Sequence, residues 1–369
     1  MAWQRAMCVV AMFFTVSAPM LRADVCRAPE SMKARLQGNP TAEAFTDLGI
    51  WFGEHKQYAC AADAFGSSLS LQPNSANVTF MFGVSLLLSG NAQEAIAPLQ
   101  VSEKLDPRNP KLHPVLASAY DELHQTRKAE TEWQAALEFD PESSPALDAL
   151  SRDLILDHDY AGTIALLENP IVSGQRTALQ SLNLGLAYAG NAKLEEASRV
   201  LRDGLNTTPD SLALANQLAS VLEQLGRPEE ASMALNLALT LHPEDIHSAD
   251  LDTEVHYLRT LVATGSEKAA AVGEQLLTAA PHNWEVLYLN AVLETKAGKL
   301  QTARDHLEQS VELNAGFASS QAALGLVLAQ MNDLHGAKEH LEKAVVLGDN
   351  NPDVEANLAK VLRSLGQAK

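Results

Sequence analysis

The densest group of side chains able to bind a metal lies in residues 242–256, HPEDIHSADLDTEVH, which holds three histidines and five carboxylates. Imidazole and carboxylate groups are common ligands of divalent ions. The spacing matches no familiar zinc or calcium loop, and no glycine stands at the turn that a calcium loop needs. Asp250 and Asp252 have a simpler use, since acidic residues cap and favour the start of a helix. We therefore expect neither a metal nor a cofactor.

The first residues resemble a secretory leader. Met1–Arg5 carries one positive charge, Ala6–Leu21 is uncharged and largely apolar, and a small residue follows at Ala23. This order is typical of a signal peptide, and we expect cleavage after Ala23 and export to a periplasmic or extracellular space. An uncleaved membrane anchor is the alternative.

Two of the three cysteines, Cys26 and Cys60, lie after the leader. Oxidising compartments favour disulfides, so we expect a bridge that closes a loop of about 35 residues. The alternative is that both thiols are free and Cys60 is a small core residue.

Sequence motifs of catalysis are missing. The chain contains no phosphate-binding glycine loop, no HExxH and no Gly-x-Ser-x-Gly. The sequence therefore predicts that the protein is not an enzyme.

The net charge is −19 and the sequence pI is about 4.9. Nucleic acids and anionic membrane surfaces are bound through clustered Lys and Arg, so neither is an expected partner.

The composition predicts an all-α protein. Apolar residues make up 46% of the chain and aromatic residues only 5%. Ala, Leu, Glu and Gln are abundant, all of them helix formers, and no stretch alternates like a strand.

Prolines mark a period of 34 residues, since Pro73, Pro107 and Pro141 are 34 apart and Pro209 and Pro243 keep the same register. An alanine stands twelve residues before each of these prolines. A small residue usually stands twelve residues before each alanine of this series, and Tyr257, twelve residues before Ala269, is the exception. This pattern predicts pairs of antiparallel helices whose backbones approach closely at the small residues. Proline then ends each pair.

The pattern resembles the tetratricopeptide repeat, in which a Leu–Gly–Tyr first helix is followed by an Ala–Phe–Ala second helix and a proline. Residues 42–75 and 178–211 carry it most clearly. The resemblance implies a right-handed superhelical solenoid of about nine helix-turn-helix units with a C-terminal capping helix. The repeats start near 42, 76, 110, 144, 178, 212, 250, 284 and 318, and the capping helix starts near 352.

Two repeats depart from the pattern. Repeat 4 has Thr163 where alanine is usual and Pro170 within its second helix, and repeat 7 follows a four-residue insertion and has Tyr257 and Gly273 at core positions. We expect a joint after repeat 4 and looser packing in repeat 7. The predicted organisation is a signal peptide (1–23), a lead-in segment (24–41), repeats 1–4 (42–177) and repeats 5–9 with the capping helix (178–369).

The resemblance also implies a concave groove lined by first helices. Carried onto this chain, the groove-facing residues in the repeats that we consider are Phe80, Val84, Ser118, Asp121, Asn216, Ser220, Glu223 and Tyr288. No basic clamp recurs among the groove positions, so an extended or helical segment with apolar and basic side chains is a better expected ligand than an acidic C-terminus.

The expected function is therefore that of a non-catalytic exported scaffold that holds a partner protein or peptide. One alternative is an accessory module for a separate envelope enzyme or for a secretion or polysaccharide-export complex. Another is a structural protein that self-associates through its last helix.

Overall fold

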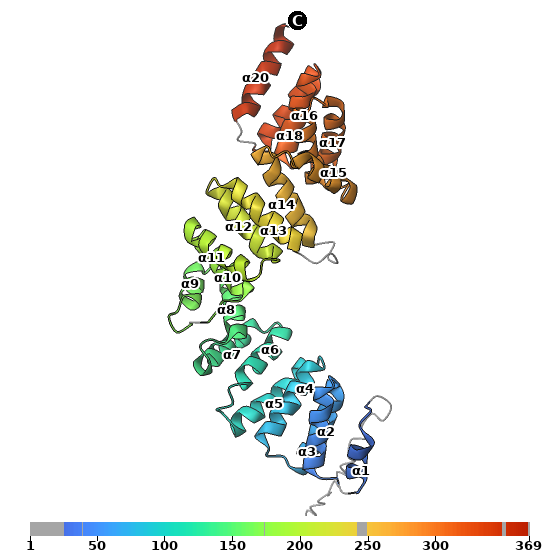
Figure 1. Ribbon diagram of the computed structural model, residues 1–369, viewed down its shortest axis with the longest axis vertical. Helices are drawn as coiled ribbons and strands as arrows, with labels where there is room; N and C mark the ends of the chain where they lie inside the picture. The colour runs from blue at the N-terminus through green and yellow to red at the C-terminus, as the bar shows by residue number, and fades with distance from the viewer. Residues whose placement is uncertain (1–25, 39, 173, 242–248, 349–351, 368–369) are drawn as a thin grey trace, which may run out of the picture. The chain divides into compact units, whose positions relative to one another are not determined.

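The computed structural model describes residues 26–38, 40–172, 174–241, 249–348 and 352–367. These residues form helices and no strand (Figure 1). The leader predicted for 1–23 lies outside the described residues. The helices are α1 (Glu30–Gly38), α2 (Ala42–Glu54), α3 (Tyr58–Leu71), α4 (Ala76–Leu88), α5 (Ala92–Leu105), α6 (Leu112–Glu122), α7 (Thr126–Phe139), α8 (Ser144–Leu156), α9 (Tyr160–Leu167), α10 (Ala178–Gly190), α11 (Leu194–Thr207), α12 (Leu212–Gln224), α13 (Pro228–Leu241), α14 (Ala249–Thr264), α15 (Ala269–Ala279), α16 (Trp284–Lys296), α17 (Leu300–Leu313), α18 (Ala318–Gln330), α19 (Leu334–Val346) and α20 (Pro352–Gln367).

The chain divides into two compact units. Compact unit 1 comprises residues 1–153 and 169–174, and compact unit 2 comprises residues 154–168 and 175–369. The division falls in repeat 4, whose second helix α9 is only 8 residues long and ends before Pro170. The boundary predicted between 177 and 178 stays a prediction.

Outside repeat 4, first and second helices alternate and pack in sequence order, so the fold is an all-α repeat solenoid. A small residue of the first helix lies under a bulky residue of the second. A Cβ atom added to Gly83 would lie 2.6 Å from Leu99 Cγ, and one added to Gly325 would lie 2.7 Å from Leu341 Cγ. Carbon atoms pack at about 3.5–4.0 Å, so only a residue without a side chain permits this approach.

Polar side chains fix the start of each pair. Thr41, Ser75 and Ser211 cap the first helices by accepting hydrogen bonds from backbone amides. Serines of the second helix tie back to the same place, because Ser68 Oγ donates to Ala42 O at 2.8 Å and Ser102 Oγ donates to Ala76 O at 3.0 Å. The angle between the two helices is thus held at two points, by packing and by a hydrogen bond.

The turn between paired helices contains one residue in the left-handed conformation, with φ between +55° and +82°. In eight repeats this residue stands seven positions after a Gly, Ala or Ser of the first helix. In repeat 7 the turn residue is Gly265, and seven positions before it stands Leu258, which is fully buried. Tyr257 is buried, as predicted for a core position, but the turn gives the place of the small residue to Leu258, one position later.

Repeat 7 exchanges the large and small positions. Leu258 is bulky where other first helices are small, and Gly273 is small where other second helices carry Phe, Leu or Trp. A Cβ on Gly273 would overlap the side chain of Asn290 in α16, whose Nδ2 donates to Gly273 O at 3.1 Å. The missing side chain therefore lets the next repeat approach α15. Helices α14 and α15 pack less extensively than the paired helices of the two neighbouring repeats, α12 with α13 and α16 with α17.

Helix α1 covers the N-terminal end of the first pair. Met32 and Leu36 pack against the cluster that includes Phe52 and Phe65. A disulfide joins Cys26 to Cys60 of α3. The lead-in segment is thus attached both by apolar packing and covalently.

We predict that Cys26→Ser lowers the free energy of unfolding of the N-terminal repeats by about 3–4 kcal/mol, because the disulfide closes a loop of 34 residues. Urea unfolding with and without reductant measures the effect. Wild-type protein in reductant should match the variant, and a variant as stable as the oxidised wild type would contradict the prediction.

We also predict that Gly83→Ala destabilises compact unit 1 by about 1–3 kcal/mol, because Leu99 must move. Gly66→Ala is the matched control, since its nearest contact would be an ordinary 3.7 Å to Phe82. Alanine has the higher helix propensity, so the control should gain up to about 1 kcal/mol. Thermal unfolding of both variants should show shifts of opposite sign.

Candidate partner-binding groove

Three consecutive first helices of compact unit 2 line an open groove of about 490 Å³. Tyr288, Val292, Thr295 and Lys296 come from α16, Ser319, Ala322, Ala323, Leu326 and Gln330 from α18, and Asp353 and Val354 from α20. The floor is mostly apolar, while one lysine and one aspartate stand among the lining residues.

Aromatic packing positions the first wall of this groove. The ring of Phe317, just before α18, lies 5.2 Å from that of Tyr288 in an edge-on arrangement and 4.6 Å from that of Trp284. Such aromatic pairs restrict side-chain rotation and add about 0.5–1.5 kcal/mol beyond area burial. Tyr288 is therefore held in one orientation beside the groove.

The predicted groove residue Tyr288 thus lines a groove together with its neighbours on α16. The residues on α18 occupy the same repeat positions one unit later, so the same carry-over from the sequence would have found Ser319, Ala322 and Leu326. Asp353 and Val354 were not predicted as groove residues, because their helix was expected only to cap the solenoid. In the structure α20 also continues the row of first helices.

In compact unit 1, the predicted residues have other surroundings. Phe80 and Val84 are half-buried on α4. Ser118 Oγ donates to Pro114 O of its own helix at 2.8 Å. Asp121 accepts a hydrogen bond of 2.9 Å from Trp133 Nε1, so its carboxylate ties α6 to α7.

The three predicted residues of α12 lie near a polar junction with α14. Asn216 Nδ2 donates to Thr253 Oγ1 at 2.6 Å, and Asn216 Oδ1 lies 3.0 Å from His256 Nδ1. Glu223 Oε1 accepts from Thr260 Oγ1 at 2.9 Å. Ser220, the third, is half-buried. Asn216 and Glu223 therefore hold two repeats together.

His256 is the buried centre of this junction. Its Nε2 lies 3.4 Å from Glu223 Oε1 but makes no hydrogen bond. Burial lowers the pKa of His256 and outweighs the opposing effect of the Glu223 carboxylate, while Arg259 lowers it further. The imidazole is thus neutral near pH 7 and is held by Asn216.

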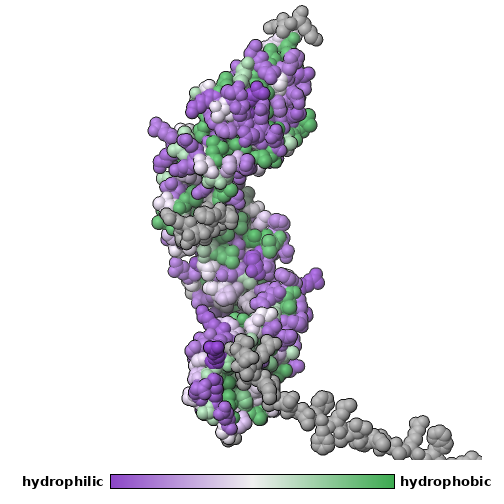
Figure 2. Space-filling view, turned by 90° about the vertical axis from the view of Figure 1, so that its right-hand side faces the viewer, coloured by the Kyte–Doolittle hydropathy of each residue, from purple (hydrophilic) through white to green (hydrophobic). Residues whose placement is uncertain are grey.

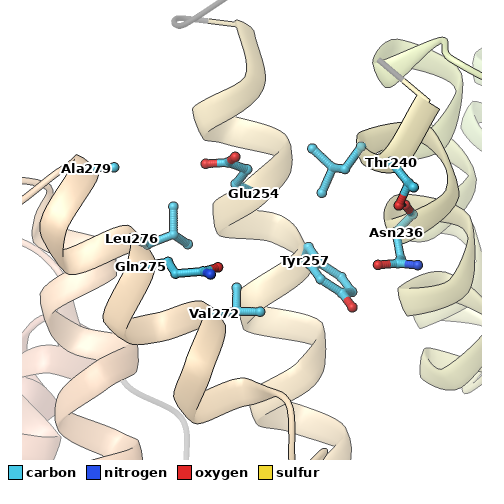
Figure 3. Close-up of a pocket in the computed structure, with 9 residues that line it drawn as sticks. Asn236, Thr240, Glu254, Tyr257, Val272, Gln275, Leu276 and Ala279 are labelled. Carbon is cyan, nitrogen blue, oxygen red and sulfur yellow. The ribbon is translucent and has the colours of Figure 1, made fainter. Parts of the chain in front are cut away.

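A second cavity, of about 280 Å³, lies on the side of the second helices in repeats 6 and 7. Figure 3 shows Glu254 and Tyr257 of α14 between Gln275 of α15 and Asn236 of α13. Burial raises the pKa of Tyr257. This cavity is consistent with the looser packing expected in repeat 7, and no sequence motif marked it as a site.

The acidic and histidine-rich segment gives no metal site in the part of the chain that the structure describes. Residues 242–248 lie outside it, and among the described residues no group of three or more His, Cys, Asp or Glu side chains is placed to hold an ion. His256, the last residue of the segment, belongs to the junction described above. In the same described ranges, each helix is too short or too polar to cross a membrane.

The surface is mixed in character. Figure 2 shows hydrophilic and hydrophobic side chains interspersed over one face of the molecule. Apolar side chains are exposed on several second helices, with Met233 at 63% and Val346 at 85%.

Family models of the tetratricopeptide repeat match residues 182–246 and 318–347. The alternating helix pairs and their small-on-large contacts agree with these matches. These two segments are tetratricopeptide repeats. The tetratricopeptide repeat fold serves in general as a scaffold for protein–protein interaction.

Two curated proteins are similar over part of their length. The mouse protein O-mannosyl-transferase TMTC3 is 24% identical over 205 residues, which cover 55% of this chain and 20% of that protein. The human tetratricopeptide repeat protein 7A is 23% identical over 293 residues, covering 74% of this chain and 33% of that protein. The chain thus spans between a fifth and a third of these relatives.

Among solved structures, the chain is similar to one in the crystal structure of the APC/C hetero-tetramer Cut9-Hcn1. The TM-score is 0.50 at 12% identity, with coverage of 92% of this chain and 93% of that chain. At this identity the similarity shows the fold alone.

We predict that the stability of compact unit 2 falls as the pH is lowered below about 6.5, the ordinary pKa of histidine. The unfolded chain binds the proton of His256 at that pH, whereas the folded chain binds it only at lower pH, so acid favours unfolding. Unfolding in urea between pH 7.5 and 5.5 should show a smaller loss for His256→Gln. An equal loss in the variant would assign the pH dependence to other groups, such as His340, whose pKa burial also lowers.

Proposed function

We propose that this protein is an exported, non-catalytic scaffold that binds a segment of a partner protein in the groove formed by α16, α18 and α20. The observation that supports the proposal best is the continuous apolar floor across these three first helices, from Val292 through Ala322 and Leu326 to Val354. A segment laid along the row would contact each helix in turn.

The lining residues define the chemistry of the ligand. One buried Leu or Phe side chain contributes about 1.5–3 kcal/mol, so two or three such side chains supply about 3–9 kcal/mol before the costs of association are subtracted. Lys296 and Asp353 offer opposite charges at different helices. An extended or helical segment with spaced apolar side chains and both charge signs fits this lining better than a purely acidic one.

Export is proposed from the sequence and supported by the disulfide. A structural disulfide such as Cys26–Cys60 is typical of periplasmic and extracellular proteins. The apolar run before Ala23 supplies a signal for the secretory pathway.

We predict that Val292→Glu reduces partner binding at least tenfold, which is about 1.4 kcal/mol, because a carboxylate in the apolar floor must be desolvated. Val346→Glu is the matched control, since this valine is 85% exposed on the second helix α19. Proteins captured from an extracytoplasmic extract of the host would be identified, and the main one purified for calorimetric titration against both variants. Equal loss or equal retention in the two variants would contradict the groove proposal.

We also predict that secreted protein begins at Asp24. N-terminal sequencing of protein recovered outside the cytoplasm checks this. A chain that stays inside the cell, or one that retains Met1 in the membrane fraction, would contradict cleavage and export.

A further inference from the structure

The cavity of about 280 Å³ between α13, α14 and α15 differs from its neighbours in the charge of its lining. Glu254 supplies a carboxylate, and none of the described residues that line the cavity is basic. Three other cavities of compact unit 2 each have a lysine among their lining residues, Lys299, Lys343 or Lys296. The described lining of this cavity therefore carries charge of one sign, which favours a cation.

The polar side chains of the lining suit a ligand that donates hydrogen bonds. A carboxylate has about four acceptor sites, so Glu254 can bind a ligand as well as a neighbour within the fold. Thr240 Oγ1 donates its proton to Asn236 O of its own helix at 2.6 Å, so this hydroxyl can only accept from a ligand. The side-chain amides of Asn236 and Gln275 each have a carbonyl oxygen. The cavity thus offers acceptors from all three helices.

An aromatic ring and aliphatic side chains form the rest of the wall. Figure 3 shows the ring of Tyr257 between Val272 of α15 and Asn236 of α13. Tyr257 is 8% exposed, so packing holds its ring in place. Leu239 and Leu276 add aliphatic surface. A ring of this kind attracts a cation, and aliphatic walls cover the stem of a long basic side chain.

The volume limits the size of the ligand. Pockets for drug-sized molecules commonly measure about 300–1,000 Å³, so this cavity lies at the lower end of that range. It is large enough for one long side chain and too small for an extended segment.

We propose that this cavity binds an arginine side chain of a partner protein. A guanidinium group has five N–H donors and no acceptor, forms paired hydrogen bonds with a carboxylate and stacks on aromatic rings. Glu254 accepts the paired hydrogen bonds, the ring of Tyr257 faces the guanidinium plane, and Val272 and Leu276 cover the stem. The charge of −19 attracts a basic partner at long range.

The same charge favours an arginine within a chain over the free amino acid. Free arginine carries its own carboxylate, which the negative protein repels, whereas an arginine within a chain has none. The inference does not rest on the proposed groove, because the cavity and the groove share no lining residue.

Calorimetric titration of the full chain with Nα-acetyl-L-arginine amide, which imitates an arginine within a chain, tests the proposal. We expect saturable binding with a dissociation constant of about 0.1–1 mM. The citrulline derivative has nearly the same shape without the charge and should bind at least tenfold more weakly. Free L-arginine should also bind more weakly than the amide.

Two variants of the lining should each weaken binding of the arginine derivative at least tenfold. Glu254→Gln removes the negative charge and keeps the shape. Gln275→Lys places a cation in the wall at an exposed position, where the fold tolerates the change. Glu229→Gln is the matched control, since this exposed glutamate of α13 lies outside the lining, and it should bind like wild type. Circular dichroism confirms that each variant is folded.

Several outcomes would overturn the proposal. They are the absence of saturable binding up to about 10 mM, equal binding of the citrulline derivative, and wild-type affinity in Glu254→Gln or Gln275→Lys. Tighter binding of free L-arginine than of the amide would overturn the assignment to a partner's side chain, because the site would then serve the amino acid itself.

Discussion

The close approach of a small residue in one helix to a bulky residue in the next is the contact on which the described fold depends. Gly83 beneath Leu99 and Gly325 beneath Leu341 leave no room for a Cβ atom. The depth of this contact sets how near the paired helices lie. Repeated along each compact unit, it aligns the first helices in one row and the second helices in another. The groove exists because α16, α18 and α20 belong to the same row.

Repeat 7 shows what happens when the contact is altered. Leu258 stands where other first helices have a small residue, and Gly273 stands where other second helices have a bulky one. The two helices of the pair therefore pack less closely, and Asn290 of the next repeat contacts Gly273 instead. Cavities border α15 on both sides. At the adjoining junction, apolar packing between first helices is partly replaced by the hydrogen bonds of Asn216, His256 and Glu223. The repeat in which the small and bulky residues are exchanged is thus also the one whose junction contains buried hydrogen-bonded polar side chains.

Most of the fold was predictable from the sequence, because the same small and bulky residues recur every 34 residues and pack in the same way in each repeat. Gly49, Gly83 and Gly185 appear in the sequence where the structure needs them. In the first helix of repeat 7, the sequence register placed the small-residue position at Tyr257, one residue before Leu258. The insertion before this repeat interrupts the regular spacing of the prolines. The left-handed backbone of Gly265 shows where the first helix ends and so fixes its register.

The candidate site was less predictable. Tyr288 lines a groove, and its role in binding stays a prediction. Asp121 and Asn216 have the same type of position, but their side chains are bonded within the fold. A repeat position determines the direction in which a side chain points, but it does not determine which neighbouring side chain forms a hydrogen bond with it. Trp133 decides the first case and Thr253 the second. Trp133 stands at the bulky position of the second-helix motif, which does not specify a side chain that donates a hydrogen bond.

The disulfide at one end has a consequence for how the chain comes apart. In a solenoid whose helices contact only near neighbours, terminal helices fray first, since they have a neighbour on one side only. Cys26 and Cys60 fasten α1 to the first pair, whereas α20 is held by side-chain packing alone among the described residues. A protease or a pulling force would therefore release α1 only after the disulfide is broken or the first pair itself unfolds.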